Sequence, residues 1–446
     1  MIRPVKPAGT TTTLLYFVGI SCMVGLAILI ILFNTEPLLV ADQWGLYTPL
    51  LKGASLVTGF FYQHGSHFLG VSYLLSRVLQ FLGLAGPLGE GFLVLGLMAL
   101  NIYLSLRIKY RLTGTLHWWD ALLIALFLYP GLAEIYLWSA HSAVVALPLM
   151  SVLLSAHFLL QKSFAKRVLG LSLVGIFSIF TGYAFLVSFQ ILLYFLFQIP
   201  RKKEKRDKRI ILAGLLSQLA AIALAVKLYQ FPPIAGMGTG NELAEYPIYG
   251  IYLLMGFLRQ SQIWPGLAWL LTTIIPPLVW LLVFRTRLHA QAFKIPLWLI
   301  AFSGIYFLLN TYSRAGIGVS GAFAARYTYF LWPGFLGIYL VLTIWPAKER
   351  LKIIPILFLL GSPLISRLTV LPEHFRSVKN YHAQVKDWLE CYQRTRDPSA
   401  CYDPDQPGPF ISSQKDKAVW FLVHWSKRQK TQITPAPLPP PASARP

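Results

Sequence analysis

The feature that most constrains this chain is a series of apolar runs separated by short basic segments. The runs are about 20 residues long, which is the length a helix needs to cross the hydrocarbon core of a bilayer. Of the 446 residues, 56% are hydrophobic and 13% are charged, which excludes an ordinary soluble protein. The pattern predicts an all-α polytopic membrane protein.

The net charge of +22 has two interpretations, nucleic-acid binding and membrane topology. The placement of the charges distinguishes them. Of the 39 Lys and Arg residues, 21 lie in segments that we assign to the cytoplasm, 7 on the outer side of the membrane domain and 11 in the C-terminal segment. The densest segment is RKKEKRDKR at 201–209. We therefore interpret the charge as topological and expect no nucleic-acid partner, only membrane lipids around the apolar runs.

The apolar runs predict about eleven transmembrane helices, with the N-terminus in the cytoplasm and the C-terminus in the periplasm. Residues 168–199 are too long for one helix and are interpreted as two short helices that meet near Thr181 and Gly182. The other predicted spans are 14–33, 92–106, 119–137, 143–160, 210–228, 267–284, 296–309, 327–345 and 353–366.

The segments between the spans are also informative. Residues 45–61 and 68–84 are apolar but interrupted by Lys52 and Arg77, which is typical of interfacial helices, in this case in the first periplasmic loop. Residues 230–264 are rich in Pro, Gly and acids and are expected to form an outer loop.

The chain divides into three parts. Residues 1–371 are the predicted transmembrane domain, 372–430 a periplasmic C-terminal segment, and 431–446 a Pro-rich disordered tail. Cys391 and Cys401 enclose a short polar loop in the second part. They would form a disulfide in an oxidising compartment such as the periplasm, the alternative being two free thiols.

The predicted topology gathers ionisable residues on the outer face, where such groups are costly to keep beside a bilayer and mark functional sites. Sugar transfer from a lipid phosphate needs a carboxylate to take the hydroxyl proton and positive charge to stabilise the departing phosphate. Arginine suits the second role because its planar fork binds two phosphate oxygens. The outer-face residues are Asp42, His64, His67, Arg77, Glu134, His141, Arg259, Arg314 and Arg326.

Simpler interpretations exist for the residues near the first span. Asp42, in ADQW, is a candidate catalytic base, or else a helix cap or a solvated loop acid. His64 and His67, in QHGSH, are candidates for acid–base chemistry, sugar contact or metal binding. Their spacing places them on one face only in a helix, which Gly65 disfavours. No third ligand lies near them in the sequence, so no metal site is predicted.

Two later motifs have similar alternatives. Trp138 stands between Glu134 and His141 in AEIYLWSAHS, either as a membrane-interface anchor or as part of a sugar platform. Arg314 and Arg326 flank a Gly-rich stretch whose backbone can approach a phosphate, and Tyr327 follows directly. Contact with lipid headgroups is the alternative for these arginines.

Four of these motifs carry a family resemblance. ADQW, QHGSHF, AEIYLWSAH and GAFAARYTYF resemble an arrangement in bacterial integral-membrane glycosyltransferases of the GT-C superfamily, and the O-antigen-modifying glucosyltransferases of phage origin look similar. The resemblance covers most of the membrane domain. It implies a GT-C-like fold in the inner membrane, a polyprenyl-phosphate-linked sugar donor, and a glycan or lipid-linked acceptor on the periplasmic face. It also implies that Asp42 acts as the base or orients the acceptor.

The sequence departs from that family at two places. Ser66 and Phe68 stand where many similar proteins carry an acid and an arginine, and no D-x-D or E-x-D lies beside Asp42. We therefore expect a metal-independent mechanism without a cofactor, a divalent metal being left open.

Two other functions would leave different patterns in the sequence. A transporter or flippase of lipid-linked saccharides would show inverted repeats and paired polar groups near the bilayer midplane, and the sequence shows neither. An O-antigen polymerase or ligase would carry a large Arg-rich outer loop, whereas Arg259 is the only arginine of 230–264.

Overall fold

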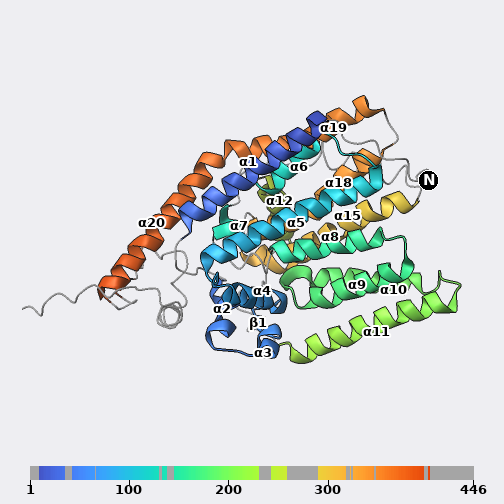
Figure 1. Cartoon of the computed structure of the whole chain (residues 1–446), viewed down its shortest axis with the longest axis horizontal. Coiled ribbons are helices and arrows are strands. Elements are labelled where there is room, and N and C mark those ends of the chain that lie inside the picture. The colour runs from blue at the N-terminus through green and yellow to red at the C-terminus, as the bar shows by residue number, and fades with distance from the viewer. Residues whose placement is uncertain are drawn as a thin grey trace, which may run out of the picture.

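The computed structural model of the chain consists of helices, turns and one short β-hairpin in the part that it describes (Figure 1). The described residues are 10–35, 43–65, 67–129, 133–137, 145–230, 243–258, 290–317, 322, 325–345, 348–395 and 400–401.

The elements are numbered in chain order. They are α1 (Thr10–Asn34), α2 (Gln43–Leu51), α3 (Leu56–Phe60), β1 (Gln63–His64), β2 (His67–Phe68), α4 (Gly70–Phe81), α5 (Pro87–Thr113), α6 (Asp120–Phe127), α7 (Ala133–Leu137), α8 (Leu147–Leu159), α9 (Phe164–Ile179), η3 (Gly182–Ala184), α10 (Phe185–Gln198), α11 (Lys205–Leu228), α12 (Glu245–Leu258), α15 (Ala290–Arg314), η5 (Ala315–Ile317), α17 (Ala325–Thr328), η6 (Tyr329–Leu331), α18 (Trp332–Ile344), α19 (Glu349–Thr369) and α20 (Leu371–Thr395).

Four helices in the described part of the chain are long and apolar enough to cross a membrane. They are α5, α11, α19 and residues Phe293–Arg314 of α15. Shorter apolar helices accompany them at Val18–Asn34, Leu147–Leu159, Gly182–Gln198 and Tyr329–Ile344. The all-α fold predicted from the sequence is therefore confirmed, whereas the number of eleven spans stays a prediction.

The long helices lie side by side in one bundle (Figure 1). Helix α8 packs against both α5 and α9, and α9 packs against α10 and α11. On the other side of the bundle α15 pairs along its length with α18 and also contacts α12. Large apolar side chains fill the space between these helices, and Leu153, Phe195 and Trp332 are fully buried there.

Basic connections between helices gather at one end of the bundle, which we call the basic end (residues 107–120, 161–167, 201–207 and 348–352). Lys109, near the end of α5, and Glu349, at the start of α19, both contact His117. Lys202, before α11, lies over the ring of Phe164 at the start of α9, 3.8 Å from the centroid. Segments that alternate with apolar helices along the sequence thus meet in space.

The other end of the bundle carries the β-hairpin, and we call it the hairpin end (residues 43–81, 180–184 and 314–317). Three short helices, α2, α3 and α4, surround the hairpin there (Figure 1). The amide of Val71 donates to the carbonyl of Phe180 at 3.2 Å, which ties α4 to the turn between α9 and α10. The amide of Gln230 donates to Gln63 Oε1 at 2.8 Å, which ties the hairpin to the end of α11.

Short helices at the hairpin end carry exposed apolar side chains. Val57 of α3 is 68% exposed, and Phe81 at the end of α4 is 90% exposed. Tyr73 on the other face of α4 is fully buried. Apolar side chains that point away from the protein are typical of helices at a membrane surface.

One predicted break between helices is found where the sequence placed it. Helix α9 ends at Ile179, and α10 begins at Phe185 after the 3-10 turn η3. Gly182 in that turn has a φ of +50°, which residues with a side chain rarely adopt. The chain can therefore reverse within a few residues.

Three sequence-based boundaries are wrong. Residues 119–137 do not form one continuous helix, because α6 ends at Phe127 and α7 begins separately at Ala133, on either side of Pro130-Gly131. Part of the expected loop at 230–264 is the helix α12, which buries Tyr249, Leu253 and Phe257 in an i, i+4, i+8 stripe. The expected span 296–309 continues as far as Arg314.

Helix α20 follows α19 directly and projects beyond the bundle (Figure 1). Its charged face is exposed, whereas Trp388 and Tyr392, whose rings stack at 5.4 Å, are buried. A disulfide joins Cys391, near the end of α20, to Cys401.

Candidate functional site

Tyr183 is the centre of a polar and aromatic cluster at the hairpin end. It belongs to η3, and its ring lies 4.1 Å from that of His67, on β2. Its hydroxyl accepts a hydrogen bond from Nη2 of Arg314, at the end of α15, with an N–O distance of 3.4 Å. Residues from three distant segments therefore meet at one phenol, which we call the Tyr183 cluster (His67, Tyr183, Arg314 and Tyr327).

Local backbone geometry places each member of the Tyr183 cluster. Gly65, with a φ of +56°, makes the tight turn that pairs His64 with His67 across the hairpin. This turn brings His67 over Tyr183. Arg314 reaches the same point because α15 ends there, at the edge of the bundle. The two histidines are therefore related by cross-strand pairing and not by helical spacing.

Arg314 combines partial burial with an aromatic environment. Its guanidinium carbon lies 5.4 Å from the centroid of the Tyr327 ring, in the arrangement of a cation–π contact. The side chain is half-buried. Among the residues that the structure describes, no carboxylate forms an ion pair with it. In this part of the chain the guanidinium contacts the phenol groups of Tyr183 and Tyr327, which do not neutralise its charge. Its other N–H groups are therefore available to bind an anion.

A buried series of hydrogen bonds holds the turns of α15 that precede Arg314. Asn310, one turn earlier on α15, donates from Nδ2 to the hydroxyl of Tyr306 at 3.0 Å. Its Oδ1 accepts from the hydroxyl of Tyr249 of α12 at 3.2 Å. The ring of Tyr306 in turn contacts that of Tyr183, with centroids 6.1 Å apart. These contacts hold the last turns of α15 against α12 and η3.

Six of the predicted site residues lie wholly or partly outside the part of the chain that the structure describes. Asp42, Trp138, His141 and Arg259 are outside the described residues. Glu134 lies on α7 and Arg326 on α17, and these two short helices pack against each other, although their side-chain positions are outside the described part.

Two other predicted residues are fully described. Arg77 of α4 donates to Gln80 of the same helix at 2.8 Å. This hydrogen bond does not connect Arg77 to the Tyr183 cluster. His64 pairs with His67 in the hairpin. Within the described part of the chain, no group of three or more His, Cys, Asp or Glu residues is arranged to hold a metal ion.

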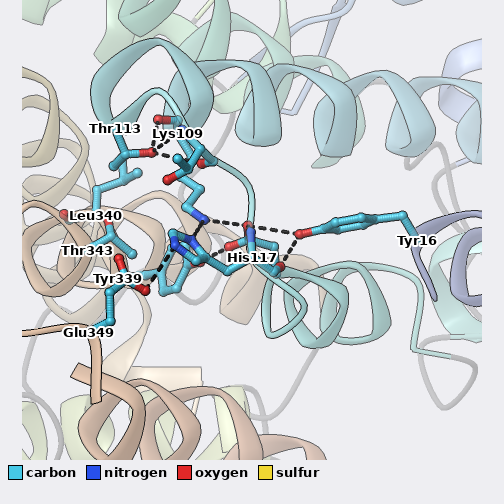
Figure 2. A network of polar contacts seen from close by, with 10 residues as sticks. Tyr16, Lys109, Thr113, His117, Tyr339, Leu340, Thr343 and Glu349 are labelled. Carbon is cyan, nitrogen blue, oxygen red and sulfur yellow. Dashed lines mark hydrogen bonds and ion pairs between the residues drawn. The ribbon is translucent and has the colours of Figure 1, made fainter. Parts of the chain in front are cut away.

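A second polar cluster, at the basic end, was missed from the sequence (Figure 2). Lys109 and Asp120, both with fully buried side chains, form an ion pair between α5 and α6. Asp120 also accepts hydrogen bonds from the hydroxyls of Tyr339 and Tyr16 and from the amide of His117 at 2.7 Å. We call it the Lys109–Asp120 cluster (Tyr16, Lys109, His117, Asp120, Tyr339 and Glu349).

His117 connects this cluster to the surface. Its Nδ1 lies 2.9 Å from Lys109 Nζ, and its Nε2 lies 3.2 Å from Glu349 Oε2. Its ring stacks on that of Trp119 at 4.3 Å. Burial, followed by the positive charge of Lys109, holds the pKa of His117 below its ordinary value, against the opposing charges of Glu349 and Asp120.

The sequence contained one usable signal for this cluster. Lys109 stands in RIKYR, where a positive charge is explained by topology alone. The LHWWD motif that precedes α6, however, places an acid at the start of an apolar run. Such an acid needs a partner, and Lys109 is the one that the fold supplies.

Arg367, near the end of α19, is another buried charge. It is 1% exposed and donates hydrogen bonds to the carbonyls of Leu126 at 3.1 Å and Phe257 at 2.7 Å. These carbonyls lie in the last turns of α6 and α12, where the helix dipole is negative. The rings of Tyr129, Phe257 and Trp332 surround its guanidinium. Arg367 therefore caps two helices from inside the bundle.

The two ionic clusters suit different chemistry. The Lys109–Asp120 cluster balances its charges internally, as a structural ion pair does. The Tyr183 cluster offers a half-buried guanidinium among aromatic rings, which suits an anionic group attached to a sugar or lipid. Comparison with protein-family models, curated proteins and solved structures finds no match for this chain.

Proposed function

We propose that the protein is a polytopic membrane glycosyltransferase. It transfers a sugar from a polyprenyl-phosphate donor to a glycan or lipid-linked glycan at the hairpin end. The observation that carries this proposal is the meeting of His67, Arg314 and Tyr327 around Tyr183. Three of these residues were candidates from the sequence, and Tyr183 stands 131 positions before Arg314.

Each residue of the Tyr183 cluster has a role in this proposal. Arg314 binds the phosphate of the donor and stabilises the charge that develops as the sugar departs. Tyr183 and Tyr327 hold its guanidinium in place. The ring of His67 forms part of the wall against which a sugar can lie. Asp42, which precedes α2, is the proposed base, and we keep it in that role from the sequence.

The proposal includes an orientation in the membrane. The basic end lies in the cytoplasm and the hairpin end at the periplasmic surface of a bacterial inner membrane, with about eleven spans in a GT-C-like fold. The gathering of the basic connections at one end of the bundle supports this orientation. The exposed apolar residues of α3 and α4 support a position of these helices at the outer interface.

The experiment is a transfer assay in proteoliposomes. Purified full-length protein is incubated with a panel of radiolabelled polyprenyl-phosphate sugars and a lipid-linked glycan acceptor. Wild type is compared with Arg314→Gln, Asp42→Asn and Arg376→Gln, the last being a matched control on the exposed face of α20. Transfer by wild type and by Arg376→Gln, but not by the first two variants, is the expected result.

Other results change the proposal in defined ways. Equal transfer by wild type and Asp42→Asn removes Asp42 as the base and moves attention to Glu134. Movement of the donor across the bilayer without any transfer replaces the proposal by a flippase. Absence of both transfer and movement, with every sugar of the panel, rejects a polyprenyl-phosphate donor.

A further inference from the structure

The buried ion pair at the basic end contacts a partly exposed histidine, His117. Lys109 and Asp120 have fully buried side chains, whereas the side chain of His117 is 21% exposed and that of Glu349 is 59% exposed. Figure 2 shows the contacts running from Glu349 through His117 to Lys109. The pH of the surrounding solution therefore acts on the buried charges through His117.

The partners of His117 determine where its proton lies. The ammonium of Lys109 is only a donor, so Nδ1 of His117, 2.9 Å away, must accept from it. Nε2 then carries the hydrogen and donates to Glu349 Oε2 at 3.2 Å. In this arrangement the imidazole is neutral and is bonded on both sides.

We propose that His117 is a proton-binding site, and that a proton bound at Nδ1 breaks its contact with Lys109 and releases the connection between α5 and α6. Once Nδ1 carries a hydrogen, two positively charged donors face each other, and the ring has to move away from Lys109. Its contact with Glu349 becomes an ion pair at the same time and favours the outward position. Segment 114–119 then keeps the hydrogen bond from the His117 amide to Asp120 but loses its second attachment, the contact of the His117 ring with Lys109.

Several charged and titratable groups face His117 from the elements packed around it. They are Tyr16 of α1, Lys109 of α5, Asp120 of α6, Tyr339 of α18 and Glu349 of α19, and Lys352 of α19 acts on Lys109. Asp120 remains paired with Lys109 when His117 is protonated, so the buried ion pair stays in place. The change is therefore confined to the ring and the segment that carries it.

The sign of the pH effect follows from the neutral ring. In the folded protein the pKa of His117 is lowered, chiefly by burial and then by Lys109, while in the unfolded chain it has its ordinary value of about 6.5. Between these two values the unfolded chain binds more protons. The stabilisation by the neutral ring is thus complete above pH about 6.5 and is lost as the pH falls below it.

The test measures the accessibility of the connection at two pH values. Thr115, which is half-buried two positions before His117, is replaced by Cys in a Cys22→Ser background of the full-length protein in detergent micelles. The rate of labelling by a methanethiosulfonate reagent is measured at about pH 8 and about pH 5.5. The same reporter in His117→Asn corrects for thiol ionisation, since Asn keeps an acceptor for Lys109 but does not titrate.

The expected result is that the labelling rate relative to His117→Asn rises several-fold at the lower pH. A relative rate that is the same at both pH values overturns the proposal. A second variant, Glu349→Gln, keeps the test decisive if His117→Asn does not fold. Removal of the Glu349 charge lowers the pKa of His117 further. The rise in the labelling rate must therefore occur at a lower pH in this variant than in wild type. A rise in the labelling rate at the same pH as in wild type would also overturn the proposal. The proposal does not depend on the glycosyltransferase function.

Discussion

The guanidinium of Arg314 donates a hydrogen bond to the hydroxyl of Tyr183, 131 positions away in the sequence, with an N–O distance of 3.4 Å. This contact joins the end of α15 to the turn between α9 and α10. It also places the charge beside the ring of His67, which lies on Tyr183. Arg314 and Tyr183 are therefore the first residues to substitute.

We expect Arg314→Gln to reduce sugar transfer by about 10- to 100-fold, because charge-assisted hydrogen bonds to a phosphate contribute about 1.5–3 kcal/mol. Arg314→Lys should retain part of the activity, since it keeps the charge but not the planar fork. Initial rates at saturating donor measure both effects. Full activity in Arg314→Gln would assign the phosphate to another cation.

Tyr183→Phe removes one hydroxyl and keeps the ring that His67 contacts. Loss of a single hydrogen bond contributes about 0.5–1.5 kcal/mol, so the KM for the donor should rise roughly 2- to 10-fold. The thermal unfolding midpoint should hardly change. Tyr183→Ala is the comparison, because it removes the ring as well and should reduce transfer further. Equal kinetics for Phe and wild type would show that the hydroxyl does not position Arg314.

Lys109→Met leaves the buried carboxylate of Asp120 without its counter-ion. Breaking a buried ion pair on one side costs about 3–5 kcal/mol, which should lower the thermal unfolding midpoint strongly. Adding Asp120→Leu removes the unpaired charge and should restore part of the loss. Recovery remains incomplete, because the hydroxyl of Tyr339 and the amide of His117 lose their acceptor. A double variant less stable than Lys109→Met would contradict this account.

Arg367→Leu leaves two helix carbonyls, those of Leu126 and Phe257, without the donors that now satisfy them. Buried groups that lose their partners cost about 1–3 kcal/mol each, so the unfolding free energy should fall by at least about 2 kcal/mol. Arg376→Leu, on the exposed face of α20, is the matched control and should change it little. Thermal unfolding in detergent distinguishes the two variants, and equal midpoints would refute the capping role.

The three cysteines give a chemical test of the C-terminal segment. With Cys391 and Cys401 joined, protein purified without reductant and then denatured should contain one reactive thiol, that of Cys22. Reduction before labelling should raise the number to the three cysteines of the sequence. Mass spectrometry of the alkylated protein counts the labels. Three labels without reduction would mean that the disulfide is absent in the cell.

Local patterns in the sequence determined which segments become helices. Long apolar runs predicted α1, α5, α11 and α19, because a helix satisfies its own backbone within one contiguous segment. The break near Gly182 was also readable, since a glycine permits the positive φ that a sharp reversal needs. Helix α12 was missed because Pro, Gly and acidic residues before and within it favour a loop in a sequence-based prediction.

The candidate sites required the tertiary structure. His67, Arg314 and Tyr327 were identified as polar residues on one face, but nothing in the sequence pointed to Tyr183, which brings them together. Lys109 was interpreted as a topological charge and Arg367 was not singled out, and both are buried against partners from other helices. Hydropathy and charge patterns report the environment of a segment, whereas these partnerships depend on which helices pack together. Only the packing of distant helices decides which charges meet.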